Sequence, residues 1–235
     1  METVPAYVTI VFLLTTFTAI GFLLRATRKA GLGLLPSQIL IFILPLWIFF
    51  QAALSVLGFY EDFTSVPPRL FLFGILPALL LVLGYIAAFH RTYVERLPLK
   101  LLTLLHIVRI PVELVLLWLS IAGQVPRMMT FQGLNFDILS GIAAPIVAWL
   151  AFRGGETRRG LLIAFNVIGI LLLANVVVIA ALSVPSSIQF LNIAEPNRAV
   201  LYFPYIYLPT IVVPIVLFSH LASLYKLLRA DRVGS

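Results

Sequence analysis

The stretch LLHIVRIPVELVLL, residues 104–117, combines an apolar run with four residues that lipid disfavours. Leucine, isoleucine and valine fill most of it. The apolar segment around it is long enough to cross a hydrocarbon core of ~30 Å as one helix. The exceptions are His106, Arg109, Pro111 and Glu113. We therefore expect a membrane-spanning helix that carries a polar notch.

The composition of the whole chain agrees with this expectation. Of 235 residues, 62% are hydrophobic and 11% are charged. Soluble domains have about 45–50% apolar and about 25% charged residues, so the excess of apolar side chains predicts a protein whose solvent is lipid. The chain has no cysteine, which excludes disulfides, iron–sulfur clusters, thiolate zinc sites and cysteine nucleophiles.

Hydropathy predicts an all-α fold in which residues 1–235 form a single seven-helix transmembrane domain, a polytopic bundle. The expected spans are roughly 7–24, 37–59, 70–90, 101–123, 137–152, 160–183 and 201–225, with boundaries uncertain by several residues. Prolines lie near the centres of five spans: Pro45, Pro77, Pro111, Pro145, Pro209 and Pro214. Proline removes a helical hydrogen bond, so we expect several kinked helices around a cavity, with ordinary packing irregularity as the alternative.

The charges sort by loop and predict an orientation. The net charge of +7 comes from basic residues in short loops between spans, so topology explains it and we expect no nucleic-acid partner. One side of the bundle carries Arg25, Arg28, Lys29, Arg91, Arg96, Lys100, Arg153, Arg158, Arg159, Lys226, Arg229 and Arg232, and the other carries Arg69, Arg127 and Arg198. The positive-inside rule then places the N-terminus outside and the C-terminus in the cytoplasm. We expect a multi-pass protein of the plasma membrane, such as a bacterial inner membrane.

The polar residues of the fourth span share one face. At about 100° per residue, His106, Arg109, Glu113 and Ser120 fall within a ~60° arc of the helix. Pro111 frees the backbone carbonyl of Ile107, which adds an acceptor to the notch. Intramembrane ionisable residues usually face the bundle interior and are candidate functional positions.

Other spans place polar groups at a matching depth. His106 is six residues from Lys100, and His220 is six residues from Lys226. Both histidines therefore lie roughly 9 Å from the cytoplasmic ends of their helices. Asn166 is expected at a similar depth in the sixth span. Gln51 lies nearer the middle of the second span.

Three functions could use the notch. In a secondary transporter of a small solute or proton, Arg109 would hold an anionic group, Glu113 would exchange a proton, and His106 or His220 would relay it. In a metal or haem protein, His106 and His220 would be ligands, with Glu113 as a third zinc ligand. The third function is a non-catalytic membrane subunit or sensor.

Transport is the leading hypothesis. It requires no cofactor and no catalytic residue. The loops are short and contain no Walker-type glycine loop, so transport would not be driven by ATP. Two structural readings stand beside it. Arg109 and Glu113 could form a neutralising i,i+4 ion pair. Asn135 and Asp137 could serve as N-caps of the fifth span.

Overall fold

The structure, a computed structural model, describes residues 4–155, 157–186 and 189–233. Residues 187 and 188, between the predicted spans 160–183 and 201–225, lie outside this part of the chain, as does the side chain of Arg232. The described residues form helices and turns but no strand. The α-helices are α1 (Ala6–Ala30), α2 (Leu35–Val56), α3 (Leu76–Phe89), α4 (Leu99–Leu105), α5 (Arg109–Ile121), α6 (Ile138–Phe152), α7 (Arg159–Ser183) and α8 (Val213–Val233).

Shorter helical turns connect or extend these helices. The 3₁₀ turns are η1 (Phe59–Glu61), η3 (Val94–Arg96), η4 (His106–Val108), η5 (Arg127–Met129) and η6 (Ala199–Leu201). Two π-helical turns, η2 (Phe71–Ile75) and η7 (Leu208–Val212), precede α3 and α8 directly. Pro77 follows η2 by two residues and Pro209 lies within η7, and π turns of this kind are frequent at functional sites.

Within the described residues, six helical segments are long and apolar enough to cross a membrane. They are Ala6–Ala30, Leu35–Val56, Phe71–Phe89, Leu99–Ile121, Arg159–Ser183 and Leu208–Arg229. The all-helical fold is therefore confirmed, and six helices of this length and apolarity are compatible with a multi-pass membrane protein. A seventh crossing by α6, which has 15 residues, remains a prediction, as do the orientation and the proline bends.

The outer surface of the bundle is apolar. Phe49 on α2 and Trp149 on α6 are 73% and 61% exposed. Large apolar patches are rare on proteins surrounded by water, so this surface is suited to lipid.

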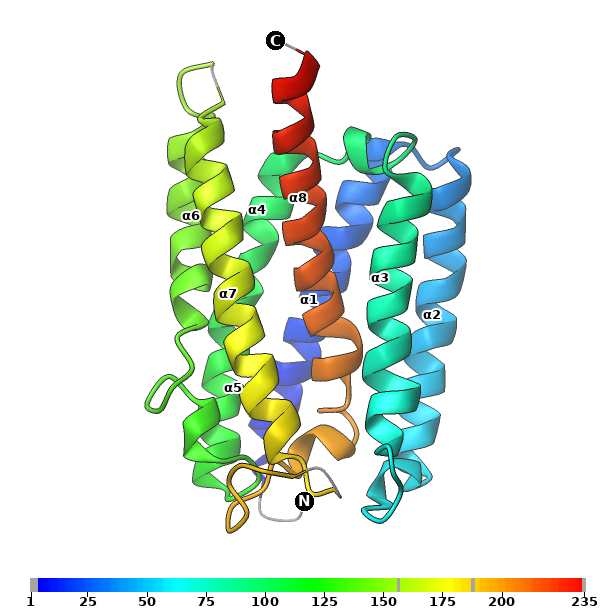
Figure 1. Cartoon of the computed structure of the whole chain (residues 1–235), viewed down its shortest axis with the longest axis vertical. Coiled ribbons are helices and arrows are strands. Elements are labelled where there is room, and N and C mark those ends of the chain that lie inside the picture. The colour runs from blue at the N-terminus through cyan, green and yellow to red at the C-terminus, as the bar shows by residue number, and fades with distance from the viewer. Residues whose placement is uncertain (1–3, 156, 187–188, 234–235) are drawn as a thin grey trace.

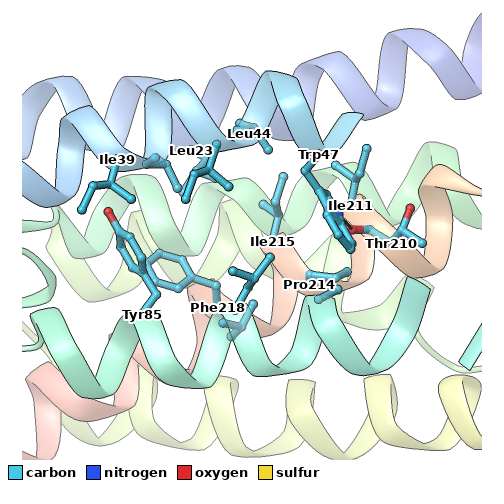
Figure 2. Close-up of a pocket in the computed structure, with 15 residues that line it drawn as sticks. Leu23, Ile39, Leu44, Trp47, Tyr85, Thr210, Ile211, Pro214, Ile215 and Phe218 are labelled. Atoms are coloured by element: carbon cyan, nitrogen blue, oxygen red, sulfur yellow. Dashed lines mark hydrogen bonds between the residues drawn. The ribbon is translucent and has the colours of Figure 1, made fainter. Parts of the chain in front are cut away.

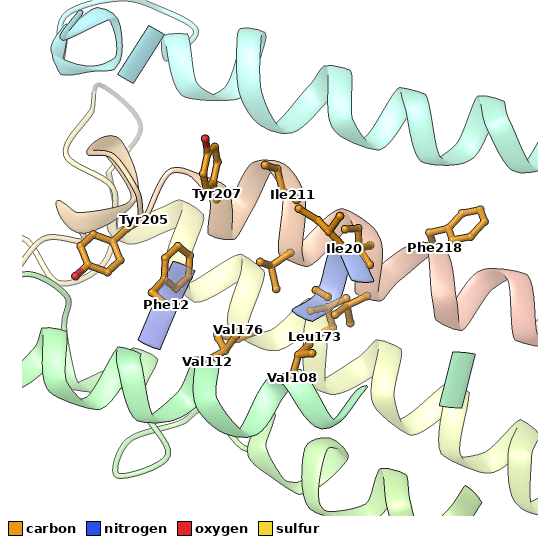
Figure 3. Packing of buried hydrophobic residues seen from close by; sticks show 14 of the residues in the cluster. Phe12, Ile20, Val108, Val112, Leu173, Val176, Tyr205, Tyr207, Ile211 and Phe218 are labelled. Atoms are coloured by element: carbon orange, nitrogen blue, oxygen red, sulfur yellow. The ribbon is translucent and has the colours of Figure 1, made fainter. Parts of the chain in front are cut away.

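Helix α8 lies at the centre of the bundle in Figure 1, between α7 on one side and α3 on the other. It contacts α3, α4 and α7, and α1 packs behind it against α4 and α5. The main core forms where these helices meet, around Phe12, Val112, Leu173 and Ile211 (Figure 3). Helix α1 enters this core through a stripe of small residues that includes Ala19 and Ala26, both fully buried. Small residues let helix backbones approach closely, which favours association in lipid.

Helix α2 is attached to the bundle by a row of hydrogen bonds. Trp47, Gln51 and Ser55 are spaced four residues apart and therefore share one face of the helix. Trp47 Nε1 donates to the Thr210 carbonyl at 2.9 Å, and Gln51 Nε2 donates to the Phe73 carbonyl at 2.9 Å. Ser55 Oγ donates to a third carbonyl, in η6, also at 2.9 Å. Two of the three acceptors belong to the π turns η2 and η7.

Candidate functional site

Two histidines from distant parts of the sequence lie against each other in the bundle. His106, in η4, and His220, on α8, are both fully buried. Their rings stack with centroids 3.8 Å apart and an interplanar angle of 17°, and Phe165 approaches the His106 ring edge-on at 5.5 Å. The depth match between the two histidines therefore corresponds to direct contact, which also makes the fourth and last predicted spans neighbours.

Helix α7 holds His220 in place. Asn166 Nδ2 donates to the Leu162 carbonyl at 2.7 Å, which leaves Asn166 Oδ1 to accept a hydrogen bond from His220 Nδ1 at 2.8 Å. One turn further along α7, Gly169 provides the space for the ring. A Cβ atom at Gly169 would lie 2.4 Å from His220 Cε1 and 2.6 Å from Nε2, so only glycine permits this packing.

Gly169 also connects the histidines to Arg109, the first residue of α5. Arg109 Nη2 donates to the Gly169 carbonyl at 3.1 Å, and Arg109 Nε lies 3.2 Å from Asp137 Oδ2. Both side chains of this ion pair are almost fully buried. Asp137, rather than the expected Glu113, is thus the ionic partner of Arg109.

Glu113 faces the segment that precedes α6. Asn135 Nδ2 donates to Glu113 Oε1 at 2.5 Å and also lies 2.9 Å from the Met129 carbonyl. Asn135 Oδ1 accepts a hydrogen bond from the backbone NH of Asp137 at 3.0 Å. Asn135 therefore positions both acidic residues: it binds the Glu113 carboxylate directly and holds the backbone of Asp137.

The segment 122–137 is mostly non-helical, and it packs several buried side chains against the bundle while others are exposed. In Figure 1, α6 begins part-way along the bundle, and the segment before it runs beside α5. Its residues Met129, Thr130, Asn135 and Asp137 are buried. Two of these residues, Met129 and Asp137, also line a cavity inside the bundle.

Close packing of α6 on α5 brings Asp137 to Arg109. A Cβ atom at Gly141 would lie 2.8 Å from Ile110 Cγ1 and 3.3 Å from Arg109 Cβ. The glycine therefore lets the start of α6 touch the charged turn of α5. Asp137 occupies the N-cap position of α6 as expected, but its side chain makes no capping hydrogen bond. The carboxylate is turned to the arginine instead.

A cavity of about 100 Å³ lies beside these charges. Its lining includes Arg109, Glu113 and Asp137, together with Asn197 and many apolar residues of α3, α5, α7, α8 and both π turns. We call it the charged cavity. Glu113 Oε2, Asp137 Oδ1 and Arg109 Nη1 are buried and have no hydrogen-bond partner among the described atoms. These atoms are available to a bound solute, proton or water.

A second cavity, of about 120 Å³, is entirely different in character. It lies between α1, α2, α3 and α8, and Ile39, Trp47, Tyr85 and Phe218 are among the residues that line it (Figure 2). Its walls contain no charged side chain. Thr210 and Ile211 of η7 line it, whereas Leu208 and Val212 of the same turn line the charged cavity. The π turn η7 thus separates the two cavities.

The structure brings five of the six predicted site residues into one region and leaves the sixth elsewhere. His106, Arg109, Glu113, Asn166 and His220 form a continuous polar cluster. Gln51 is buried in a separate cluster, where its Oε1 accepts a hydrogen bond from the Tyr60 hydroxyl at 2.6 Å. From the sequence, Asp137 and Asn135 were expected to have only a capping role. An acidic side chain at the start of an apolar helix, with no basic residue nearby in the sequence, indicates a role beyond capping.

The stacked histidines do not suit a metal ion or a haem iron held between them. A metal binds in the plane of an imidazole, about 2.0–2.1 Å from the nitrogen in the case of zinc. Two nearly parallel stacked rings direct their lone pairs along nearly parallel planes, so the lone pairs do not converge on one point. Nor do the described residues include any group of three or more histidine, cysteine, aspartate or glutamate side chains that could hold a metal.

Comparison with known proteins assigns a family. The model of the family described as "Domain of unknown function (DUF8737)" matches residues 66–228, which is more than half of the chain. The chain belongs to this family. The matched DUF8737 region contains the whole polar cluster and Asp137, whereas α1, α2 and Gln51 lie outside it. No curated protein and no solved structure matches the chain.

Proposed function

We propose that the protein is a secondary transporter in which the charged cavity binds a small solute and exchanges a proton. The observation that carries the proposal is that Arg109, Glu113 and Asp137 line one cavity inside an apolar bundle. An ionisable group at the centre of a membrane helix costs ~2.5–3.5 kcal/mol on insertion scales, and such groups usually mark ion or proton pathways. A structural ion pair needs only two of these three residues.

Glu113 is suited to proton exchange because its two oxygens have different environments. Oε1 is held by Asn135, whereas Oε2 has no hydrogen-bond partner within the described structure. A proton can therefore bind or leave at Oε2 without breaking the bond that positions the carboxyl group. Arg109 is fixed by Asp137 and the Gly169 carbonyl, so its charge is already balanced beside Glu113.

The histidine pair is placed to pass protons toward the basic end of the bundle. Gly169 touches both Arg109 and His220, so the pair adjoins the charged cavity. Both nitrogens of His106 and Nε2 of His220 are buried without a hydrogen-bond partner among the described residues. Interior histidines and carboxylates commonly form proton relays, and we assign this role to His106 and His220.

Irregular turns supply candidate hinges around the cavity. The 3₁₀ turn η4 separates α4 from α5 at His106, and η2 and η7 contact each other beside the cavity. Discontinuous helices at the substrate site allow parts of a transporter bundle to move against each other. The proposal includes α6 as a seventh span, with the segment 122–137 completing the thickness of the bundle. It also includes a plasma-membrane location with the basic loops in the cytoplasm.

The experiment that tests this function uses purified protein in liposomes that contain a pH-sensitive dye. Short-chain amines, carboxylic acids and neutral alcohols are added outside, and the internal pH is followed in wild type, Glu113→Gln and Glu61→Gln. The pH change in protein-free liposomes, which neutral amines and undissociated acids enter unaided, is subtracted from each. Glu61 is an exposed acidic residue outside the charged cavity, so its variant is the matched control. We expect solute-dependent proton movement in the wild type and in Glu61→Gln but not in Glu113→Gln.

Elution volume and thermal unfolding must be the same for the three proteins. Proton movement that is equal in Glu113→Gln and wild type would refute the proposed role of Glu113. Absence of any solute-dependent proton movement in the wild type would refute transport of these solute classes. A loss of folded Glu113→Gln protein would favour the structural reading, and a membrane subunit or sensor would then be the better account.

A further inference from the structure

We infer that the charged cavity selects a small apolar amine, which it binds as a monovalent cation in competition with a proton at Glu113. The inference rests on the proposed function and names its substrate class. It follows from the charge balance of the cavity, from the composition of its walls and from its opening.

The charge balance leaves one carboxylate over. Arg109 and Asp137 neutralise each other across 3.2 Å, and Glu113 is bound by the neutral amide of Asn135. The only other polar residue of the lining is Asn197, and the described lining from α3, α7 and α8 carries no charge. Glu113, whose side chain is 1% exposed, therefore presents an uncompensated oxygen when ionised. A buried charge of this kind requires a counter-charge.

The rest of the wall is hydrocarbon. Leu79 of α3, Leu173 and Val176 of α7 and Val216 of α8 are typical of it. A sugar or an amino acid would lose its hydration here without regaining hydrogen bonds, which is costly. An anion would meet an arginine that already has a carboxylate partner. One ammonium group on a short hydrocarbon matches both the charge and the walls.

The size and the opening of the cavity fit the same ligand. An apolar cavity of ~150 Å³ binds benzene, so about 100 Å³ admits a hydrocarbon of a few carbons. Leu79, Val177 and Ala180 line the cavity and are only half-buried. These residues belong both to the cavity wall and to the partly exposed apolar faces of α3 and α7. An amphiphile dissolved in the bilayer would enter past them.

Proton balance gives the binding step a signature. At a pH where Glu113 is protonated, the ammonium ion displaces the carboxyl proton, which passes to the solvent while the ammonium pairs with Oε2. The neighbours that act on this equilibrium are Asp137 and Asn135 from the segment before α6 and Arg109 from α5. Amine affinity should fall as the pH is lowered, and binding should release a proton.

Calorimetric titration of the full chain in detergent tests the inference without any transport measurement. The probes are butylamine, butanol and pentanoate, which share a butyl chain and differ in charge. We expect butylamine to bind most tightly and pentanoate not to bind. In Glu113→Gln, butylamine affinity should fall about tenfold or more, since a hydrogen bond to a charged group is lost, while butanol binding stays the same. Glu61→Gln should behave as wild type.

A second variant keeps the test decisive if Glu113→Gln does not fold. Ala180→Leu enlarges a side chain at the rim without changing a charge, and it should weaken both butylamine and butanol. Heats measured in two buffers of different ionisation enthalpy report the released proton. Butanol binding as tightly as butylamine in the wild type would overturn the inference, and so would butylamine affinity that does not depend on pH.

The outcomes also separate this inference from the proposed function. Butylamine bound at Glu113 with no solute-dependent proton movement in liposomes would refute transport and leave the amine site standing. Proton movement driven by carboxylates or alcohols, with no binding of butylamine, would support transport and refute the amine site.

Discussion

Replacing Gly169 by alanine tests whether the histidine stack and α7 pack as described. The added methyl carbon would lie 2.4 Å from His220 Cε1, whereas ordinary contacts begin at 3.4 Å. The ring would therefore have to move by about 1 Å. It is held at one face by His106 and at Nδ1 by Asn166, so the movement disrupts one of these contacts.

The magnitude follows from two opposing terms. Overpacking of a well-packed interior costs about 1–3 kcal/mol. Alanine gains roughly 0.5–1 kcal/mol over glycine within a helix. Gly84→Ala serves as the matched control, because Gly84 lies within α3 and a Cβ atom added there would have no neighbouring atom within 4 Å. The helix term is common to both variants, so the stability difference between them isolates the steric term of about 1–3 kcal/mol.

Reversible unfolding in mixed micelles, followed by circular dichroism, measures both free energies of unfolding. We expect Gly84→Ala to be at least as stable as wild type and Gly169→Ala to be clearly less stable. Adding His220→Ala should make the cost of Gly169→Ala disappear, because the atoms that clash are removed and the two effects are coupled. Equal stability of Gly169→Ala and Gly84→Ala would contradict this packing, since it would mean that the space next to His220 is open.

Three further substitutions probe the polar cluster and the loop near the basic end. Asp137→Asn should cost about 3–5 kcal/mol of unfolding free energy by leaving Arg109 unpaired, with recovery when both residues become apolar; unchanged stability in micelles would contradict the ion pair. Asn135→Ala should cost about 1–3 kcal/mol, because it leaves a buried Glu113 oxygen without its donor, and equal thermal midpoints would argue against that bond. Tyr93 lies outside the spans, and burial raises the pKa of its hydroxyl group from 10.0 to about 12. The stability that the buried neutral hydroxyl contributes is therefore complete below pH 10.0 and is lost as the pH rises toward about 12. Tyr93→Phe should therefore lower stability at neutral pH by about 1 kcal/mol and weaken the loss of stability in that alkaline window, as seen in unfolding curves at several pH values.

Helix periodicity was sufficient to predict which side of the fourth span is buried. His106, Arg109 and Glu113 all face the interior, because their spacing alone defines one face of a helix. Counting residues from the basic loops likewise placed His106 and His220 at one depth, and the two rings are in contact. Periodicity and depth are local properties of the chain, so the sequence contains them.

The pairing of the charges depends on the path of a non-helical segment. Arg109 and Asp137 meet because the chain turns back into the bundle after α5 and because Gly141 allows close contact with Ile110. Neither the path of this segment nor the close contact at Gly141 produces a periodic pattern in the sequence, so neither could be predicted from it. The position of Gln51 along its helix could likewise be estimated from the sequence, but the segment against which it packs could not. That segment depends on the order in which the helices pack.

The attachment of α2 has a consequence for how this protein can vary in evolution. Trp47, Gln51 and Ser55 bind main-chain carbonyls, and every amino acid offers the same carbonyl oxygen. Substitutions at Phe73 or Thr210 therefore need no compensating change on α2. Correlated substitution between positions is the usual evolutionary trace of contact, and it should be weak across this interface. The three donor residues should be constrained individually, whichever side chains stand at positions 73 and 210.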